Sequence, residues 1–369
     1  MRPTIKKILS ASTLLLAVVS TYARADWKTD WDKTLAAANE EGRVVVYTYP
    51  GQELVFQEFQ KKYPEIKMVE VSVRGADRTV RIAAERRAGK YLADLLIGGA
   101  GSAYFGLYKT GALDPIKPAM ILPEVVDESK WWARKHIYGD DEGEHILAFA
   151  GAHLYYFYYN TNLLSADEFK SYWDLLHPKW RGKILIAEPL SGGTPEILQF
   201  LYHNPELGPE FLRRFFTEMD LTVTRDIRQL LDWLAQGKYA IAGFQNADRV
   251  GLWEARKQGL AVAAFDTGKF KEGILVGSGG GNIALINRAP HPNAAKIFIN
   301  WLLSRDGQIA WQKLVVGGRN SLRSDIPKDD VPLYARIPEG TKYTLIDDPA
   351  YSDMESVRKF VNEVWKKKK

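Results

Sequence analysis

The sequence predicts an α/β fold with parallel sheets, because short apolar runs alternate with amphipathic helical patterns along the chain. Residues 43–50 read RVVVYTYP and residues 93–99 read ADLLIGG, and each run has the length of a buried strand. A second set of alternating segments begins with KILIAEP at residues 183–189. Two such sets within 369 residues indicate two domains.

The first set contains three predicted strands, and each of them leads into a helix. A further helix precedes the first strand and ends at Gly42, the residue type that most often follows a helix. Residues 114–147 are predicted to be irregular because proline and acidic residues interrupt every pattern there. In chain order, the predicted elements are helix 27–41, strand 43–50, helix 53–64, strand 66–73, helix 78–89, strand 93–99 and helix 100–111.

The second set repeats the alternation and is followed by a pair of strongly amphipathic helices. The chain then becomes rich in loops and ends in a helix that carries four terminal lysines. In chain order, the predicted elements are strand 183–189, helices 195–204, 208–219 and 226–237, strand 239–244, the helix pair 291–314 and helix 354–369.

Two long extended runs, residues 146–164 and 273–286, connect the two sets. We interpret parts of them, near 148–155 and 273–281, as two crossing hinge strands that let two lobes close over a ligand. The predicted domains are a signal peptide over 1–25, lobe 1 over 26–148 plus 277–316, and lobe 2 over 149–276 plus 317–369.

Residues 1–25 have the pattern of a cleavable signal peptide: a basic start, an apolar run and the small-x-small site Ala23-Arg24-Ala25. Removing them lowers Lys plus Arg from 50 to 46 against 45 acidic residues, so the mature chain is nearly neutral and a nucleic-acid partner is not expected. The chain has no cysteine, which excludes a lipid-anchored N-terminal cysteine. We therefore expect an exported protein of the periplasm of a Gram-negative bacterium.

Three turns at predicted strand ends offer backbone N–H groups to an anion, because ligands of open α/β sheets bind at the carboxyl ends of strands. In the alternative interpretation, the same glycines and hydroxyl groups only form tight turns and cap helices. Ser102 in particular is predicted to cap the helix that follows. The candidate residues of these turns are Arg74 and Arg78; Gly99, Gly101 and Ser102; and Ser191, Gly192, Gly193 and Thr194.

Polar residues follow two further predicted strands and extend the candidate site. Arg225 lies at the start of helix 226–237, which Thr224 or Asp226 is expected to cap. The loop that begins at Thr48 and Tyr49 offers an aromatic side chain for the apolar part of a ligand. After strand 239–244 come Gln245, Asn246 and Asp248, for which exposed loop polarity is the alternative.

Motifs for catalysis are missing from the sequence, so neither an enzyme nor a cofactor is predicted. The six histidines have no metal-ligand spacing, and no nucleophile elbow, cysteine nucleophile or phosphate-binding loop occurs. GSGGGN at 277–282 precedes a strand rather than a helix, which favours a hinge or the wall of a cleft over a nucleotide site. LYYFYYN at 154–160 offers tyrosines to a metal, but strand alternation favours packing.

Taken together, these segments resemble the extracellular solute-binding proteins of ABC importers, in the branch that includes ferric-iron, thiamine and phosphonate binders. The resemblance implies a two-lobed periplasmic-binding-protein fold of type II, the Venus-flytrap fold, in a monomer that delivers a small ligand to an inner-membrane permease. It spans essentially the whole mature chain. The segments that carry it are residues 44–64, 88–99, 159–164, 171–194, 232–241 and 291–308.

The resemblance also implies a ligand class. Ser191-Gly192-Gly193 match the turn that binds an anionic group in this branch, and Arg225 falls where a polar ligand contact is frequent. Ferric binders place a histidine in the first loop, an acid after the third strand and two tyrosines near Ala247, and none of these is present here. A small anionic solute, a carboxylate, phosphate or phosphonate, is therefore expected without metal ligands from the protein; a ferric ion or chelate and, in another class, an exported α/β hydrolase are the alternatives.

Overall fold

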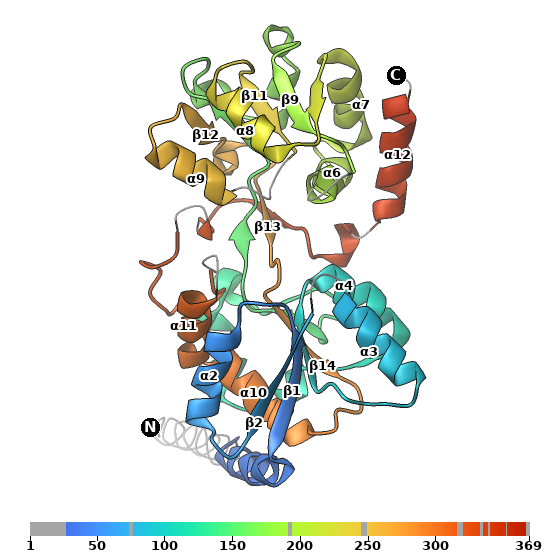
Figure 1. Ribbon diagram of the computed structural model, residues 1–369, viewed down its shortest axis with the longest axis vertical. Helices are drawn as coiled ribbons and strands as arrows, with labels where there is room; N and C mark the ends of the chain where they lie inside the picture. The colour runs from blue at the N-terminus through green and yellow to red at the C-terminus, as the bar shows by residue number, and fades with distance from the viewer. Residues whose placement is uncertain are drawn as a thin grey trace, which may run out of the picture. The chain divides into compact units, whose positions relative to one another are not determined.

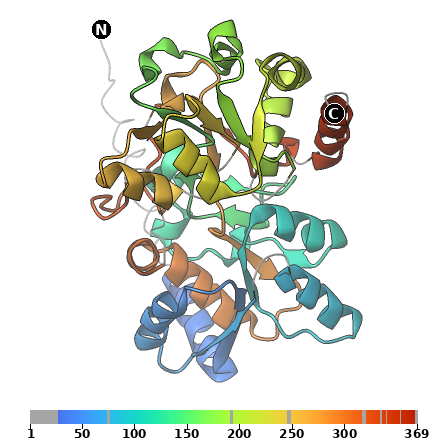
Figure 2. The ribbon, with the colours of Figure 1, turned by 45° about the horizontal axis from the view of Figure 1, so that its top comes forward.

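The computed structural model describes residues 27–73, 77–190, 194–244, 249–315, 320–332, 335–338, 340–351 and 353–366. The chain divides into two compact units, which are drawn in Figures 1 and 2. Unit 1 comprises Met1–Ala150 and Gly280–Asp330, and unit 2 comprises Gly151–Gly279 and Val331–Lys369. The predicted signal peptide lies outside the described residues. Among the described residues, no helix has the length and apolar character needed to span a bilayer.

Unit 1 is built on a seven-stranded mixed sheet with the order β2-β1-β3-β14-β6-β5, and β4 pairs with β14. β1, β2 and β3 are mutually parallel, as the alternation of strands and helices predicts. β14 pairs antiparallel with β3 on one side and with β6 on the other. The strands are β1 Arg43–Thr48, β2 Lys67–Ser72, β3 Leu95–Gly98, β4 Leu113–Asp114, β5 Ile137–Tyr138, β6 Ile146–Ala148 and β14 Asn282–Ile286.

α2, α4 and α10 pack against strands of the unit 1 sheet, and α11 packs on α2 and α10. An aromatic cluster joins α2 to α10, in which Phe59 lies 5.0 Å from Phe298 and 5.3 Å from Trp301 between ring centroids. The α-helices are residues 27–41, α2 Glu53–Lys62, α3 Asp77–Arg87, α4 Ala100–Gly106, α5 Pro123–Val126, α10 Pro292–Leu303 and α11 Arg305–Leu314. Short 3-10 turns are η1 Tyr108–Thr110, η2 Lys117–Ala119, η3 Glu128–Lys130 and η4 Trp132–Arg134.

Unit 2 contains a five-stranded sheet with the order β10-β9-β11-β8-β12 and a three-stranded sheet with the order β15-β13-β7. β9, β10 and β11 are parallel, and β8 pairs antiparallel with β11 and β12. The strands are β7 Ala152–His153, β8 Phe157–Asn160, β9 Ile184–Ala187, β10 Thr222–Thr224, β11 Ile241–Gly243, β12 Val262–Ala264, β13 Ile274–Gly277 and β15 Tyr343–Leu345.

The core of unit 2 is rich in phenylalanine, which accounts for much of the aromatic content of the chain. Phe215 and Phe244 are fully buried, and their ring centroids lie 5.5 Å apart. Tyr156 and Tyr158 are also buried in this core, as the packing interpretation of their segment predicts. The helices are α6 Thr194–His203, α7 Gly208–Glu218, α8 Ile227–Ala235, α9 Arg249–Lys257 and α12 Met354–Lys366, with 3-10 turns η5 Ala166–Glu168, η6 Tyr172–Leu176, η7 Pro178–Trp180, η8 Thr267–Lys269 and η10 Pro349–Tyr351.

The chain passes between the units at 150/151, 279/280 and 330/331, whereas the sequence-based boundaries are 148/149, 276/277 and 316/317. Residues 320–330 belong to unit 1, whereas the sequence analysis assigned them to lobe 2. The reason is Arg323, which is 1% exposed. Its guanidinium donates to the Leu303 carbonyl at 3.0 Å, contacts Asp325 at 2.8 Å and pairs with Glu124 at 3.2 Å, all within unit 1.

Candidate functional site

The carboxyl ends of the parallel strands of unit 1 bring three predicted site segments to one edge of the sheet. β1 ends at Thr48 and β3 ends at Gly98. β2 ends at Ser72 and is followed by α3, whose second residue is Arg78. Loops that follow parallel strands meet at the same edge, which is where ligands of open α/β sheets bind. We call this region the unit 1 edge.

Arg78 is the charged side chain of the unit 1 edge, and it is 5% exposed. Its Nη1 donates to the Val73 carbonyl at 3.1 Å, and its Cζ lies 5.5 Å from the centroid of the Tyr49 ring. Its Nε is buried without a hydrogen-bond partner, and no carboxylate among the described residues forms an ion pair with it. Burial lowers the pKa of Arg78, but a guanidinium stays charged at neutral pH. The edge therefore holds a desolvated cation with unused donor capacity.

Glycines allow this close packing. A Cβ on Gly98 would lie 2.8 Å from Arg78 Nη2, and a Cβ on Gly280 would lie 2.3 Å from Tyr49 Cε1. The Tyr49 ring and the guanidinium thus occupy space that side chains at these positions would fill. Gly280 belongs to the glycine run that the sequence analysis assigned to a hinge or a wall, and in unit 1 it is the wall against which Tyr49 lies.

Thr48 forms part of the unit 1 edge but is completely buried. Its hydroxyl donates to Gln52 Oε1, and Gln52 Nε2 is buried without a partner. Asn282 Nδ2 donates to the Gly98 carbonyl at 3.0 Å and ties β14 to β3. The sequence analysis missed Gln52, and it placed Gly280 and Asn282 in a hinge or cleft wall without including them among the site residues.

Ser102 does not cap the helix that follows β3, which corrects the sequence-based prediction. α4 begins at Ala100, and Gly99 is its N-cap residue. Ser102 is therefore inside the first turn, where its hydroxyl donates to the Gly99 carbonyl at 3.0 Å, as serine often does three residues into a helix. A Cβ on Gly101 would meet no atom within 4 Å, so the backbone at Gly101 is open on that side.

The corresponding edge of unit 2 lies at the carboxyl ends of β9, β10 and β11, and Arg225 follows β10 there. Arg225 makes a bidentate ion pair with Glu188, which follows β9: the Nε–Oε2 distance is 2.5 Å and the Nη2–Oε1 distance is 2.8 Å. The Arg225 side chain is 81% exposed, and the Glu188 hydrogen bond raises its pKa. Asp226 caps α8 by accepting from the Arg228 and Gln229 N–H groups, as predicted.

Acidic side chains dominate the rest of this unit 2 edge. The Tyr156 hydroxyl donates a hydrogen bond to Glu196, which lies in the first turn of α6. Asp347 accepts from the Ser278 N–H at 2.7 Å, and burial together with the charge of Glu196 raises the pKa of Asp347 to about 6. Among the described residues, no group of three or more histidine, aspartate and glutamate side chains is arranged to hold a metal ion.

Several predicted site residues stay predictions because the structure does not describe them. α6 begins at Thr194, directly after the predicted anion turn, but the side chain of Thr194 is not described. The predicted site residues that lie outside the described part of the chain are Arg74, Ser191, Gly192, Gly193, Gln245, Asn246 and Asp248.

Comparisons with known proteins agree with this architecture. The family model described as bacterial extracellular solute-binding protein matches residues 42–309. An iron-binding protein from Trichodesmium, solved with iron and citrate, has a TM-score of 0.67 at 18% identity over 88% of this chain and 99% of its own. The Bordetella ferric binding protein has a TM-score of 0.67 at 20% identity, with 87% and 98% covered.

The Campylobacter jejuni ferric binding protein has a TM-score of 0.60 at 15% identity, over 87% of this chain and 99% of that protein. At these identities the structural likeness establishes the two-lobed fold, and the family model establishes the family. No curated protein matches the chain in sequence.

Proposed function

Because the chain belongs to the bacterial extracellular solute-binding protein family, we propose that it captures a small anionic solute for an ABC importer. The solute class is a carboxylate, phosphate or phosphonate. One observation carries the anion assignment: Arg78 is a buried guanidinium at the carboxyl edge of parallel strands, without a described acidic partner. A bound anion would supply the missing counter-charge and accept from the buried Nε.

In this proposal, the two units close on the solute about the segments that connect them. The unit 1 edge contributes Arg78 and the face of Tyr49, while unit 2 contributes the N–H groups of the turn before α6 and the guanidinium of Arg225. Nη1 of Arg225 has no partner among the described residues, so it has a donor to offer while Glu188 holds the other two nitrogens. Planar guanidinium groups suit carboxylates and phosphates because they donate along two parallel directions.

A ferric chelate is the second candidate, since the structural neighbours include proteins solved as ferric binders, one of them with iron and citrate. The chelate itself is an anion, so the same arginines would serve it. A bare ferric ion is disfavoured because the sequence lacks the first-loop histidine, the acid after the third strand and the tyrosines near Ala247 that the resemblance to ferric binders implies.

Calorimetric titration of the mature protein with a panel of small carboxylates, phosphates and phosphonates tests the proposal, together with ferric citrate and ferric ion alone. Native mass spectrometry of protein taken from its host would first identify any co-purified solute. We expect an anion that binds wild type and binds Arg78→Gln far more weakly. Binding that is equal in both proteins for every ligand found would refute the anion assignment, and an iron-dependent signal only with citrate would select the chelate.

A capture experiment tests the proposed permease partner. We expect that vesicles containing the permease capture the protein more strongly when the confirmed solute is present, because closure presents both units together. If the vesicles capture the protein equally with and without the solute, the delivery role is contradicted, whereas the solute-binding results still stand.

A further inference from the structure

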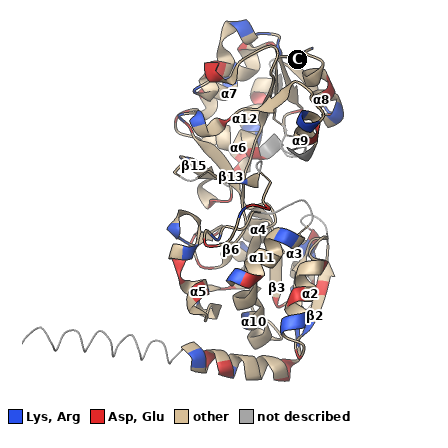
Figure 3. Ribbon diagram, turned by 90° about the vertical axis from the view of Figure 1, so that its left-hand side faces the viewer, with Lys and Arg blue, Asp and Glu red and all other residues tan. Residues whose placement is uncertain are grey.

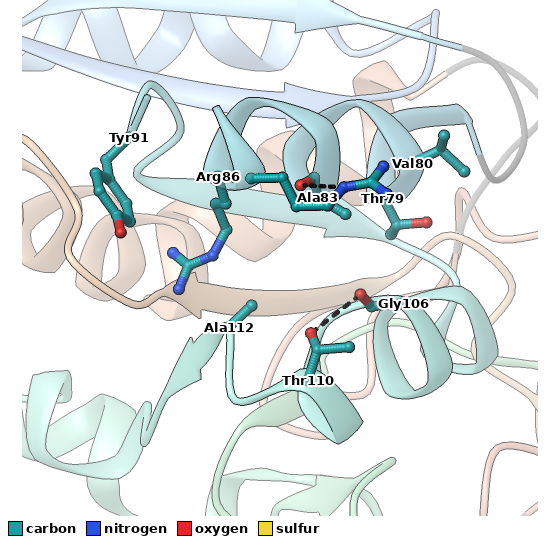
Figure 4. Close-up of a pocket in the computed structure, with 9 residues that line it drawn as sticks. Thr79, Val80, Ala83, Arg86, Tyr91, Gly106, Thr110 and Ala112 are labelled. Atoms are coloured by element: carbon teal, nitrogen blue, oxygen red, sulfur yellow. Dashed lines mark hydrogen bonds between the residues drawn. The ribbon is translucent and has the colours of Figure 1, made fainter. Parts of the chain in front are cut away.

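Unit 1 contains a pocket away from the unit 1 edge, between α3 and the segment that contains α4 and η1. Its volume is about 510 Å³, within the range of about 300–1,000 Å³ that is usual for small-molecule sites. Figure 4 shows Arg86 and Tyr91 toward one end of the pocket and Val80 at the other. Arg78 is in the first turn of α3 and Arg86 in the last, roughly 12 Å apart along the helix axis. The pocket is therefore distinct from the proposed solute site.

The Tyr91 end of the pocket is strongly basic. The guanidinium carbons of Arg86 and Arg288 lie 5.1 and 5.2 Å from the centroid of the Tyr91 ring, and Arg288 also donates to the Tyr91 hydroxyl at 2.8 Å. Arg87 also lines the pocket, where its Nε donates to the Ala83 carbonyl at 3.4 Å, and Lys90 follows the helix. Figure 3 shows the basic residues on α3. We call Arg86, Arg87, Lys90 and Arg288 the basic cluster.

No member of the basic cluster forms an ion pair with a carboxylate among the described residues. Arg86 donates instead to the backbone carbonyl of Asn287 at 2.7 Å, and Arg87 is exposed. Two acids in this region already have partners: Glu85 binds Arg81 and the Tyr47 hydroxyl, and Asp114 accepts from the Asn287 amide. Some cations on other helices do form ion pairs, as Arg214 does with Glu218. Cations without counter-charges on one part of the surface attract an anion from solution.

Apolar side chains form part of the pocket wall, which Thr79 and Thr110 also line. Val80 is 60% exposed, and Ala83 and Ala112 are the other apolar residues with a side chain that line the pocket, besides Tyr91. A ligand that fills the pocket would therefore place an apolar body on these side chains and its charge on the guanidinium groups. Inorganic phosphate or sulfate would leave the apolar part empty.

We propose that this pocket is a second ligand site, which binds a small amphipathic carboxylate with its charge on Arg86 and Arg87 and its apolar body along Ala83 and Val80. The site lies wholly within unit 1, so it does not depend on closure of the two units. It is independent of the proposed function, because it uses neither Arg78 nor any residue of unit 2.

Fluorine NMR of para-fluorobenzoate with the full mature protein tests this proposal. We expect binding with a dissociation constant on the order of 1 mM or tighter, and about tenfold weaker binding of the neutral para-fluorobenzyl alcohol. Arg87→Gln should weaken para-fluorobenzoate binding about fivefold, because it removes one charge without disturbing a buried contact. Arg81→Gln is the matched control, since it removes the same charge from an exposed position on the same helix.

Ala83→Leu supplies a second, independent test because it fills the pocket and leaves every charge in place. We expect it to weaken para-fluorobenzoate binding about tenfold, with an unchanged melting temperature. Arg78→Gln should leave this binding intact, which separates the pocket from the proposed solute site. The proposal is overturned if para-fluorobenzoate does not bind, if Arg87→Gln and Ala83→Leu both bind like wild type, or if Arg78→Gln alone abolishes binding.

Discussion

The two parallel-strand edges of this protein both carry an arginine, but in opposite electrostatic settings. In unit 1, Arg78 is buried, packed by Tyr49 and Gly98, and has no described acidic partner. In unit 2, Arg225 is exposed and already bound to Glu188 through two hydrogen bonds. The Arg78 guanidinium is desolvated and has no described counter-ion. The Arg225 guanidinium is solvated and is paired with a carboxylate.

This difference indicates how the binding energy is divided. A desolvated donor gains more from an incoming anion than a solvated one, because the solvation of the donor has already been lost on folding. The unit 1 edge is therefore expected to contribute most of the affinity. Unit 2, which carries Glu188, Glu196 and Asp347, is expected to tune affinity and pH response.

The largest effect is expected from Arg78→Gln. Losing charge-assisted hydrogen bonds in a buried site costs about 1.5–3 kcal/mol, so affinity for the confirmed anion should fall roughly 10- to 100-fold. Calorimetry measures this loss, and Arg81→Gln serves as the control on the same helix. If the two variants bind the anion equally well, the buried Arg78 contributes no more to affinity than an exposed arginine, and the proposed difference between the edges is wrong.

Gly280→Ala should come next, because its Cβ would overlap the Tyr49 ring at 2.3 Å. We expect a loss of about 1–3 kcal/mol in the free energy of unfolding, and weaker anion binding, as the ring moves off Arg78. Urea denaturation of Gly280→Ala, Tyr49→Ala and the double variant forms a cycle. The cost of Gly280→Ala should shrink in the Tyr49→Ala background; strictly additive costs would show that the ring and the glycine do not interact.

Asp347→Asn tests whether the raised pKa of Asp347 makes the stability of the protein depend on pH. The folded-state pKa of Asp347, about 6, is above its ordinary value of 3.8 because of burial, so the folded state binds the proton more tightly than the unfolded state. The contribution of this residue to stability is therefore present at low pH and is lost as the pH rises through about 6. Asp347→Asn should raise the melting temperature at pH 7 by several degrees and much less at pH 5, and Asp348→Asn, at the exposed neighbour, is the control variant.

The smallest effects are expected at the exposed pair. Arg225→Ala should weaken anion binding about two- to fivefold, and Glu188→Gln should strengthen it by a similar factor, because it frees the guanidinium from its carboxylate. Titrations at low and high salt measure both changes, which should shrink as the salt concentration rises. If Arg225→Ala weakens anion binding as much as Arg78→Gln does, the two edges contribute equally to the affinity.

Much of the fold could be predicted because its strands are buried on both faces and appear as continuous apolar runs. β1, β3 and β9 are examples, and Gly51 and Gly99 lie in the turns that follow the first two of these strands. The assignment of 320–330 failed for a physical reason: an isolated arginine in a loop-rich segment gives no sign that it will be buried against Leu303 and Glu124.

The candidate site was harder to predict, because the burial and pairing of its side chains depend on contacts between distant segments. Position alone identified Arg78 and Arg225 as strand-end cations, but not which of them is buried or paired. The partner of Arg225 lies 37 residues away, across a neighbouring strand. Tyr49 and Gly280 belong to different ends of unit 1 in sequence, and only the pairing of β14 with β3 brings them together.

The position of β14 in unit 1 has a consequence for the nascent chain. β14 fills the centre of the sheet between β3 and β6, yet Asn282–Ile286 follow the entire five-stranded sheet of unit 2 in the order of synthesis. Until those residues emerge, the unpaired edges of β3 and β6 are open to pairing with another chain. A holdase that covers these two edges during biogenesis would protect the molecule at its most vulnerable stage, and a ribosome stalled before Asn282 would release an aggregation-prone half-sheet.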